Sequence, residues 1–214
     1  MVVASWTYSV SLCCKGVNHV RRQPLTRDAI LDAAVELLDR HGLAGLSMRR
    51  LGAALGVEAM SLYHHLPSKD ALLDGIHERI LTALEPPPSA RSWQAFARHQ
   101  AHALHRALLA HPHAIPLFAT RPAATPAAVE QLDRYVAVLV DAGFKPVDAL
   151  SVVQLVAQLV VGHAMWSTSV AVGVVVDAPP HTRQVERALE RWNPDRELEL
   201  GIDALLHGLA RLRA

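Results

Sequence analysis

The sequence contains little cysteine, few aromatic residues and almost no net charge. Its two cysteines, Cys13 and Cys14, are adjacent, so a disulfide between them would be strained. The absence of a disulfide framework is typical of a reducing, cytoplasmic setting. Phe, Trp and Tyr make up 5% of the chain and hydrophobic residues 51%, so the core must consist mainly of alanine, leucine and valine, which suits helices. The formal net charge of +1 excludes a surface that is basic all over.

The sequence also lacks the motifs of common catalytic chemistry. It has no serine nucleophile elbow, no glycine-rich phosphate loop, no H-E-x-x-H and no C-x-x-C. Three of the 13 histidines, His99, His102 and His105, are spaced i, i+3, i+6, but the outer two point in different directions from a helix. We therefore expect no enzyme activity, no metal and no cofactor. A histidine-based metalloenzyme is an alternative hypothesis, and it would require that the purified protein holds metal tightly.

Neither a signal peptide nor a membrane span is expected. The first 20 residues lack a basic start and a small-residue cleavage site. We expect residues 1–23 to form a disordered extension; the alternative is a basic-ended arm that reaches a DNA groove. The apolar segment 148–176 includes Gln154, Gln158 and His163 and has no Lys/Arg cluster on one side, so a buried helix is favoured over a span.

The segment Leu46–Leu73 predicts a helix-turn-helix followed by a capped fourth helix. Ser47 can cap a short helix, and Gly56 provides the tight turn after it. Val57 and Leu62 can then pack inward, which leaves the rest of the next helix facing outward. Pro67 ends that helix and Ser68 can cap the fourth one. A first helix precedes the segment; it begins after Thr26, ends at Gly42 and carries the apolar stripe Ile30, Ala33, Ala34, Leu37 and Leu38.

Positive charge in this part of the chain is local. Residues 24–84 include six Lys or Arg against eight Asp or Glu, so a charge argument for DNA binding fails on the totals. The candidates are Arg49, Arg50 and Lys69. We expect modest non-specific affinity for DNA with a clear dependence on salt.

The remaining sequence predicts a second helical domain. Pro86, Pro87 and Pro88 mark the boundary. Apolar stripes then predict helices beginning at Trp93 and near Val129, the long apolar helix, and a last helix over 196–213. We therefore predict an all-α protein with a helix-turn-helix domain at 24–84, whose fourth helix (68–84) is the connector, and a helical domain at 89–214.

Two runs carry a resemblance to a known family. "ILDAAVELLDRHGLAGLSMRRLGAALGV" and "LYHHLPSKDALL" resemble the DNA-binding domain of the tetracycline-repressor family of bacterial transcriptional regulators. "SWQAFARHQAHALHRALL", "TRP" and "AGF" are similar to the core of the family's founding member. The resemblance implies a homodimer held by helices near 147–170 and 196–213, double-stranded operator DNA as one partner, and a small-molecule effector.

The resemblance also implies roles for individual residues. Ser47 and Arg49 match positions that touch DNA backbone and bases, and Tyr63 and Lys69 match phosphate contacts. The recognition-helix surface falls on Ala59, Met60, Ser61, His64 and His65. Since Ala59 and Met60 offer no hydrogen bonds, we expect an operator different from that of the tetracycline repressor. For Tyr63 and His65 the alternative is that they merely pack the module.

The effector pocket implied by the resemblance involves four positions. A pocket asparagine matches Gln100, a phenylalanine matches Leu104, and a metal-binding histidine falls on Leu117 or Phe118. A second pocket histidine falls on Leu84 or Glu85, near the end of the fourth helix. Because the metal ligand is missing, we expect a small apolar effector and not magnesium-tetracycline. Gln100 is a candidate orienting group; a glutamine half-solvated at the edge of its helix is the alternative.

These observations predict a ligand-released repressor that acts as a homodimer on a palindromic operator. The alternative is a small-molecule-binding helical dimer with a vestigial DNA-binding module.

Overall fold

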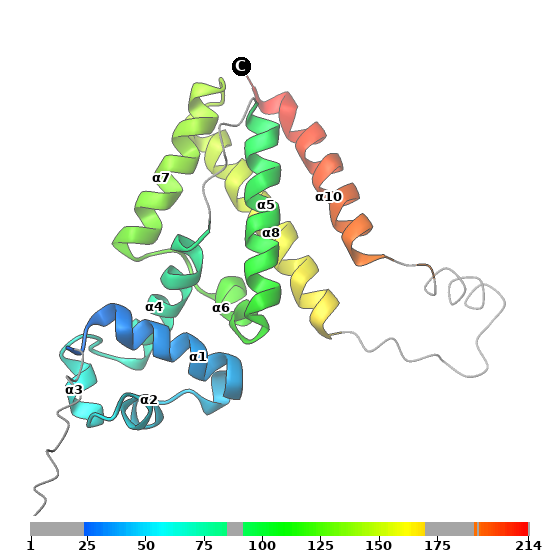
Figure 1. Ribbon diagram of the computed structural model, residues 1–214. Helices are drawn as coiled ribbons and strands as arrows, with labels where there is room; N and C mark the ends of the chain where they lie inside the picture. The colour runs from blue at the N-terminus through cyan, green and yellow to red at the C-terminus, as the bar shows by residue number, and fades with distance from the viewer. Residues whose placement is uncertain (1–23, 85–91, 170–190, 192, 214) are drawn as a thin grey trace, which may run out of the picture.

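The computed structural model describes residues 24–84, 92–169, 191 and 193–213, and within these ranges all long elements are helices (Figure 1). The expected extension 1–23, Glu85, the proline boundary and residues 170–176 lie outside the described residues. The all-α prediction is confirmed.

The N-terminal part consists of four helices: α1 (Arg27–Gly45), α2 (Met48–Leu55), α3 (Ala59–Tyr63) and α4 (Lys69–Thr82). Side-chain oxygens of Thr26, Ser47 and Ser68 accept backbone N–H bonds at the starts of α1, α2 and α4, as predicted. Gly42 has φ 66° and ψ 178°, so it breaks α1 with a positive φ, although one further turn follows it. Leucine and isoleucine dominate the core of this part, with Leu38, Leu51 and Leu72 fully buried.

The C-terminal part begins with α5 (Trp93–Ala110), the short turn Pro112–Ala114 and α6 (Ile115–Thr120). It continues with α7 (Pro126–Asp141), α8 (Pro146–Ser169), α10 (Pro194–Leu209) and a final turn, Ala210–Leu212. The last helix therefore begins two residues before the predicted range 196–213 and ends in a tighter turn. Helix α8 lies at the centre of this part, where α5, α6, α7 and α10 pack against it (Figure 1).

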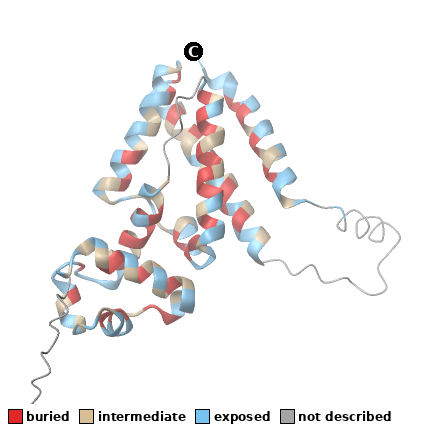
Figure 2. Ribbon diagram, viewed as in Figure 1, coloured by how far each residue is buried: buried red, intermediate tan, exposed pale blue. Residues whose placement is uncertain are grey.

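The long apolar helix is packed only on part of its surface. Residues Pro146–Thr168, with a mean hydropathy of 1.5, are long and apolar enough to cross a membrane by length and composition alone, and 28% of an 18-residue stretch within them is buried. Ala149, Val152, Val156 and Val160 face the core that α8 shares with α5 and α10. Other apolar side chains of α8 remain exposed, as the alternating colours along the C-terminal helices show (Figure 2).

The N-terminal and C-terminal parts are not fully separate in the structure, because residues that follow α5 pack in the N-terminal core. Ala114 and Leu117, which follow α5, are buried in the core of the N-terminal part, against α1 and α4. Helix α4 in turn packs against α6 and α7 of the C-terminal part. A change in the position of α6 must therefore affect the helices that form the N-terminal core.

Candidate DNA-binding surface and ligand cavity

The turn between α2 and α3 is fixed by local geometry. Gly56 adopts the left-handed conformation (φ 67°, ψ 30°), which favours glycine. The N–H of Val57 donates to the carbonyl of Gly52 at 2.9 Å. A Cβ on Gly52 would lie 2.8 Å from the Val57 carbonyl oxygen, so only glycine fits where the two helices meet. Leu62 is fully buried beneath α3, as predicted, which orients the opposite face of the helix outward.

The predicted recognition surface is presented to solvent. Met60 is 69% exposed and Tyr63 41%, and His64 and His65 are also exposed. This exposure favours the recognition role of Tyr63 and His65 over the alternative in which they only pack the module. Ala59 and Ser61 are half-buried along the same short helix.

Basic residues flank this surface on two other helices. Arg49 is exposed in the first turn of α2, next to the half-buried cap Ser47. Lys69 is exposed at the start of α4, where backbone N–H groups favour an anion. Arg50 has a structural role instead, since its Nη1 donates to the Gly45 carbonyl at 3.1 Å. These helices thus place Ser47, Arg49, Lys69 and the exposed face of α3 in one helix-turn-helix module.

A cavity of about 740 Å³, partly open to solvent, is lined by residues of α4, α5, α6, α7 and α8. Most of its lining is apolar; the polar or titratable members are His77, Gln100, Arg121, Gln131, Tyr135, Gln154 and Gln158. Its volume lies within the range of about 300–1,000 Å³ typical of drug-sized ligands. The cavity therefore has the size and character of a small-molecule site.

Three of the four predicted pocket residues line this cavity: Gln100, Leu104 and Phe118. Leu117 does not; it is 3% exposed and packs in the N-terminal core. Neighbouring residues of a helix point in different directions, so α6 places Phe118 toward the cavity and Leu117 away from it. Leu84, which also aligned with a pocket histidine, lines the cavity as well.

Gln100 is buried, with 8% exposed, so the half-solvated alternative is wrong. Neither its Oε1 nor its Nε2 has a hydrogen-bond partner among the described residues. Gln131 provides a contrast, because its Nε2 donates to the Leu81 carbonyl at 2.9 Å and to the Tyr135 hydroxyl at 2.7 Å. The protein thus holds the amide of Gln131 by hydrogen bonds, whereas the amide of Gln100 has none within the described part of the chain.

Two ring pairs form part of the cavity wall. His77 of α4 meets Phe118 of α6 edge to face, with ring centroids 4.3 Å apart. Burial lowers the pKa of His77; the negative charge of Asp74 opposes this and the positive charge of Arg121 adds to it, and the net direction favours the neutral imidazole. Phe96 and Tyr135 meet edge to face at 5.5 Å. Neither His77 nor Tyr135 belongs to a sequence motif, so neither could be predicted as a site residue from the sequence.

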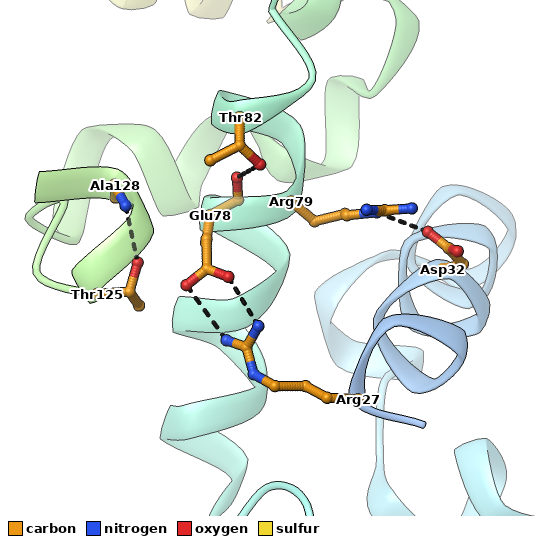
Figure 3. Close-up of polar contacts among 7 residues, drawn as sticks. All are labelled: Arg27, Asp32, Glu78, Arg79, Thr82, Thr125 and Ala128. Atoms are coloured by element: carbon orange, nitrogen blue, oxygen red, sulfur yellow. Dashed lines mark hydrogen bonds and ion pairs between the residues drawn. The ribbon is translucent and has the colours of Figure 1, made fainter. Parts of the chain in front are cut away.

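Ion pairs connect α4 to both parts of the molecule. Arg27 forms two bonds with Glu78, at 2.7 and 3.2 Å, and Arg79 pairs with Asp32 of α1 at 2.7 Å (Figure 3). Arg121, at the end of α6, holds both Asp74 at 2.6 Å and Asp70 at 2.5 Å. Helix α4 is therefore attached to α1 on one side and to the cavity wall on the other.

Exposed apolar side chains gather on α8 and α10. Trp166 is 58% exposed and Leu200 70%, and Leu155 and Met165 are about 40% exposed. The two helices also pack against each other, with Leu159 close to Gly201. These are the helices near 147–170 and 196–213 for which a dimer interface is predicted.

The fold and these two sites define a helical DNA-binding regulator with a helix-turn-helix domain and a separate cavity for a small molecule. Residues 30–76 match the family model "Bacterial regulatory proteins, tetR family", and residues 85–213 match "Tetracyclin repressor-like, C-terminal domain". The chain belongs to the tetracycline-repressor family of transcriptional regulators. The resemblance predicted from the sequence is thereby confirmed.

Relatives are similar over most of their length. The class C tetracycline repressor of Escherichia coli is 30% identical over 204 residues, which cover 88% of this chain and 92% of that protein. ActR of Streptomyces coelicolor, in complex with actinorhodin, has a TM-score of 0.75 at 27% identity and covers 88% of this chain and 98% of its own. The class A tetracycline repressor in complex with 5a,6-anhydrotetracycline and magnesium has a TM-score of 0.68 at 26% identity, covering 88% and 100%. These relatives are regulators and not enzymes.

Proposed function

We propose that the protein is a repressor that binds a palindromic operator as a homodimer and leaves it when a small apolar molecule fills the cavity. The main observation that supports this proposal is that α4 contributes residues to both the recognition surface and the cavity. Its first residue, Lys69, borders the recognition surface, while His77 and Leu81 of the same helix line the cavity.

The DNA contacts follow from exposure and chemistry. The guanidinium of Arg49 suits guanine or a phosphate, and Lys69 at a helix start suits a phosphate. Tyr63 offers a hydroxyl to the backbone, as do Ser47 and Ser61 at its flanks. Ala59 and Met60 can contact thymine methyl groups, and His64 and His65 can donate to bases or phosphates.

A homodimer accounts for the exposed apolar faces of α8 and α10. Pairing them across a two-fold axis would bury Leu155, Trp166 and Leu200, which a monomer leaves in water. The same axis would place two recognition helices against two half-sites, which requires a palindromic operator.

Release follows from the position of the cavity. A ligand between α4, α5 and α6 must contact the wall formed by His77 and Phe118. In this scheme α4 has two orientations, and only one of them places the recognition helices so that they match the DNA. A ligand that binds the other orientation more tightly shifts the population toward it.

The test is fluorescence anisotropy of the protein with DNA from upstream of its own gene, beside scrambled DNA, over a salt series. We expect nanomolar binding to one palindrome and much weaker, salt-erased binding to scrambled DNA. Lys69→Ala and Tyr63→Phe should both weaken operator binding, while Lys145→Ala, an exposed lysine before α8, should not. Equal binding by all variants and both DNAs would favour the alternative, a small-molecule-binding dimer with a vestigial DNA module.

A further inference from the structure

Two histidines form a contact where α5, α8 and α10 meet. Nε2 of His105, on α5, lies 3.2 Å from Nδ1 of His163, on α8. Nε2 of His163 lies 3.0 Å from the carbonyl oxygen of Pro194, the first residue of α10. His105 is buried, and neither histidine lines the cavity. The pair therefore joins three helices at a place outside both sites described above.

The hydrogen bonds determine which ring nitrogens carry protons. A carbonyl oxygen only accepts, so Nε2 of His163 donates to Pro194, and Nδ1 of the neutral ring accepts. Nε2 of His105 must then donate to that Nδ1. Two neutral rings thus satisfy both contacts. One added proton places a charge on a buried group, and a second one sets N–H against N–H between two positive rings.

We propose that the His105–His163 pair is a pH switch: the neutral pair holds the first turn of α10 against α5 and α8, and protonation of the pair releases that turn and weakens the dimer. This inference rests on the proposed function, in which α8 and α10 form the dimer interface. The exposed Trp166 lies three residues after His163, and the exposed Leu200 lies six residues after Pro194. The switch is therefore within two helical turns of the apolar side chains that the dimer would bury.

Burial gives the switch its direction. It lowers the pKa of the His105 imidazole, and a positive charge on His163 lowers it further. Asp195 of α10 acts in the opposite direction and His102 in the same direction as burial, and the net direction favours the neutral ring. A histidine whose pKa is lowered in the folded state stabilises that state above its ordinary value of 6.5. This contribution is lost as the pH falls through the folded value.

Other charged groups hold α10 further along its length. Arg98 of α5 pairs with Glu199 at 2.9 Å and also with Asp203. His102 lies 2.9 Å from Glu199, and protonation would strengthen that contact, which is the opposite of the effect proposed for the switch. On α8 the other charged residue, Asp148, is 15 residues before the pair. Acid should therefore loosen the first turn of α10 while the next turns stay paired with α5.

The proton positions can be measured directly. Long-range ¹H–¹⁵N correlation NMR of the full-length protein at pH 7.5 distinguishes charged imidazoles and the two neutral tautomers. We expect His105 and His163 both to be neutral with the proton on Nε2. A charged ring, or a proton on Nδ1 in either ring, would overturn the inference.

The effect on assembly is measured as the dimer dissociation constant between pH 7.5 and pH 5.5, by analytical ultracentrifugation without DNA. For the wild type we expect the dimer to become about tenfold weaker, because one group with a lowered pKa changes an equilibrium by up to about tenfold per pH unit below its ordinary value. His105→Gln keeps an N–H donor for His163 but does not titrate, and His105→Leu places an apolar side chain in the buried position. Both should weaken less than about threefold over the same range.

Two control variants separate the pair from other histidines. His41→Gln, at an exposed position of α1, should weaken in acid as the wild type does. His102→Gln should weaken at least as much, since it removes the contact that acid strengthens. Circular dichroism establishes folding; if His105→Gln does not fold, His105→Leu is the test. A wild-type dimer that does not weaken in acid, or a weakening that persists in both variants of His105, overturns the inference.

Operator binding at pH 7.5 separates this result from the proposed function. If operator is bound specifically while the dimer is indifferent to pH, the switch is wrong and the regulator stands. If the dimer weakens through His105 but no specific DNA is bound, the switch stands and the repressor is wrong. A monomer at pH 7.5 would contradict both.

Discussion

Removing Arg27 tests how α4 is held against α1. The Glu78 side chain is 11% exposed and that of Arg27 41%, and two bonds join them (Figure 3). Arg27→Met would leave a nearly buried carboxylate without its partner, whereas Glu78→Gln leaves a guanidinium that water reaches. We therefore expect the first substitution to be the more destabilising of the two.

The magnitude follows from the exposure of the pair. Removing one partner of a fully buried ion pair costs about 3–5 kcal/mol. Because Arg27 is partly exposed, water can enter once its head group is gone, and we expect a loss of roughly 1–2 kcal/mol for Arg27→Met. For a chain of this size that corresponds to a fall in melting temperature of roughly 2–8 °C. Arg40→Met removes the exposed pair with Glu36 and should cost less than about 0.5 kcal/mol.

The stability lost in Arg27→Met should depend on pH. Burial raises the pKa of Glu78, but bonds from Arg27 and Thr125 more than offset this and lower it below the usual 4.5. A lowered folded pKa gives stability that is present above pH 4.5 and lost as pH falls through the folded value. Without Arg27, burial has the larger effect and raises the pKa of Glu78. Protonation of Glu78 then stabilises the variant, so its loss of stability relative to the wild type should become smaller as the pH falls from 7.5 to 4.5.

The assay is urea unfolding followed by circular dichroism, at one protomer concentration because dimerisation is linked to stability. Wild type, Arg27→Met, Glu78→Gln, the double variant and Arg40→Met form one set. Equal losses for Arg27→Met and Arg40→Met, or a deficit that does not change with pH, would refute the reasoning.

Three further outcomes are expected. Gly52→Ala should unfold the helix-turn-helix and abolish operator binding, whereas Gly56→Ala meets no other atoms and should cost only the strain of its left-handed φ, about 1–2 kcal/mol by urea unfolding. Leu200→Glu together with Trp166→Glu should convert dimer to monomer in light scattering and weaken operator binding; an unchanged mass would place the interface elsewhere. EDTA should not change effector affinity in calorimetry, since no carboxylate is among the described cavity residues; a clear loss would implicate a metal.

Local chemistry explains what could be predicted from the sequence. The caps Thr26, Ser47 and Ser68 and the turn glycine Gly56 depend on residues within a few positions, and all four behave as expected. The burial of Leu62 could also be predicted, because Leu62 is a large apolar residue on the inner side of the short helix that follows Gly56.

Long-range packing explains which features could not be predicted from the sequence. The choice between Leu117 and Phe118 depends on which side of α6 faces the core of the N-terminal part, and no spacing in the sequence reveals that. The contacts of Arg121 with Asp70 and Asp74 join residues that are 47 and 51 positions apart. Gln100 could be singled out by resemblance, but its lack of a partner depends on which residues α7 and α8 bring near it.

In the proposed function, helix α4 connects the cavity to the recognition surface. Lys69 and His77 are eight residues apart, a rise of about 12 Å along one helix. Lys69 and His77 belong to one continuous helix, so a tilt of that helix at His77 would also move Lys69. The clamp of Arg121 on Asp70 and Asp74 connects the same helix to the end of α6, beside Phe118. A hundredfold loss of operator affinity then requires the ligand to favour the released state by about 2.7 kcal/mol, which a few hydrogen bonds and ring contacts formed in that state alone can supply.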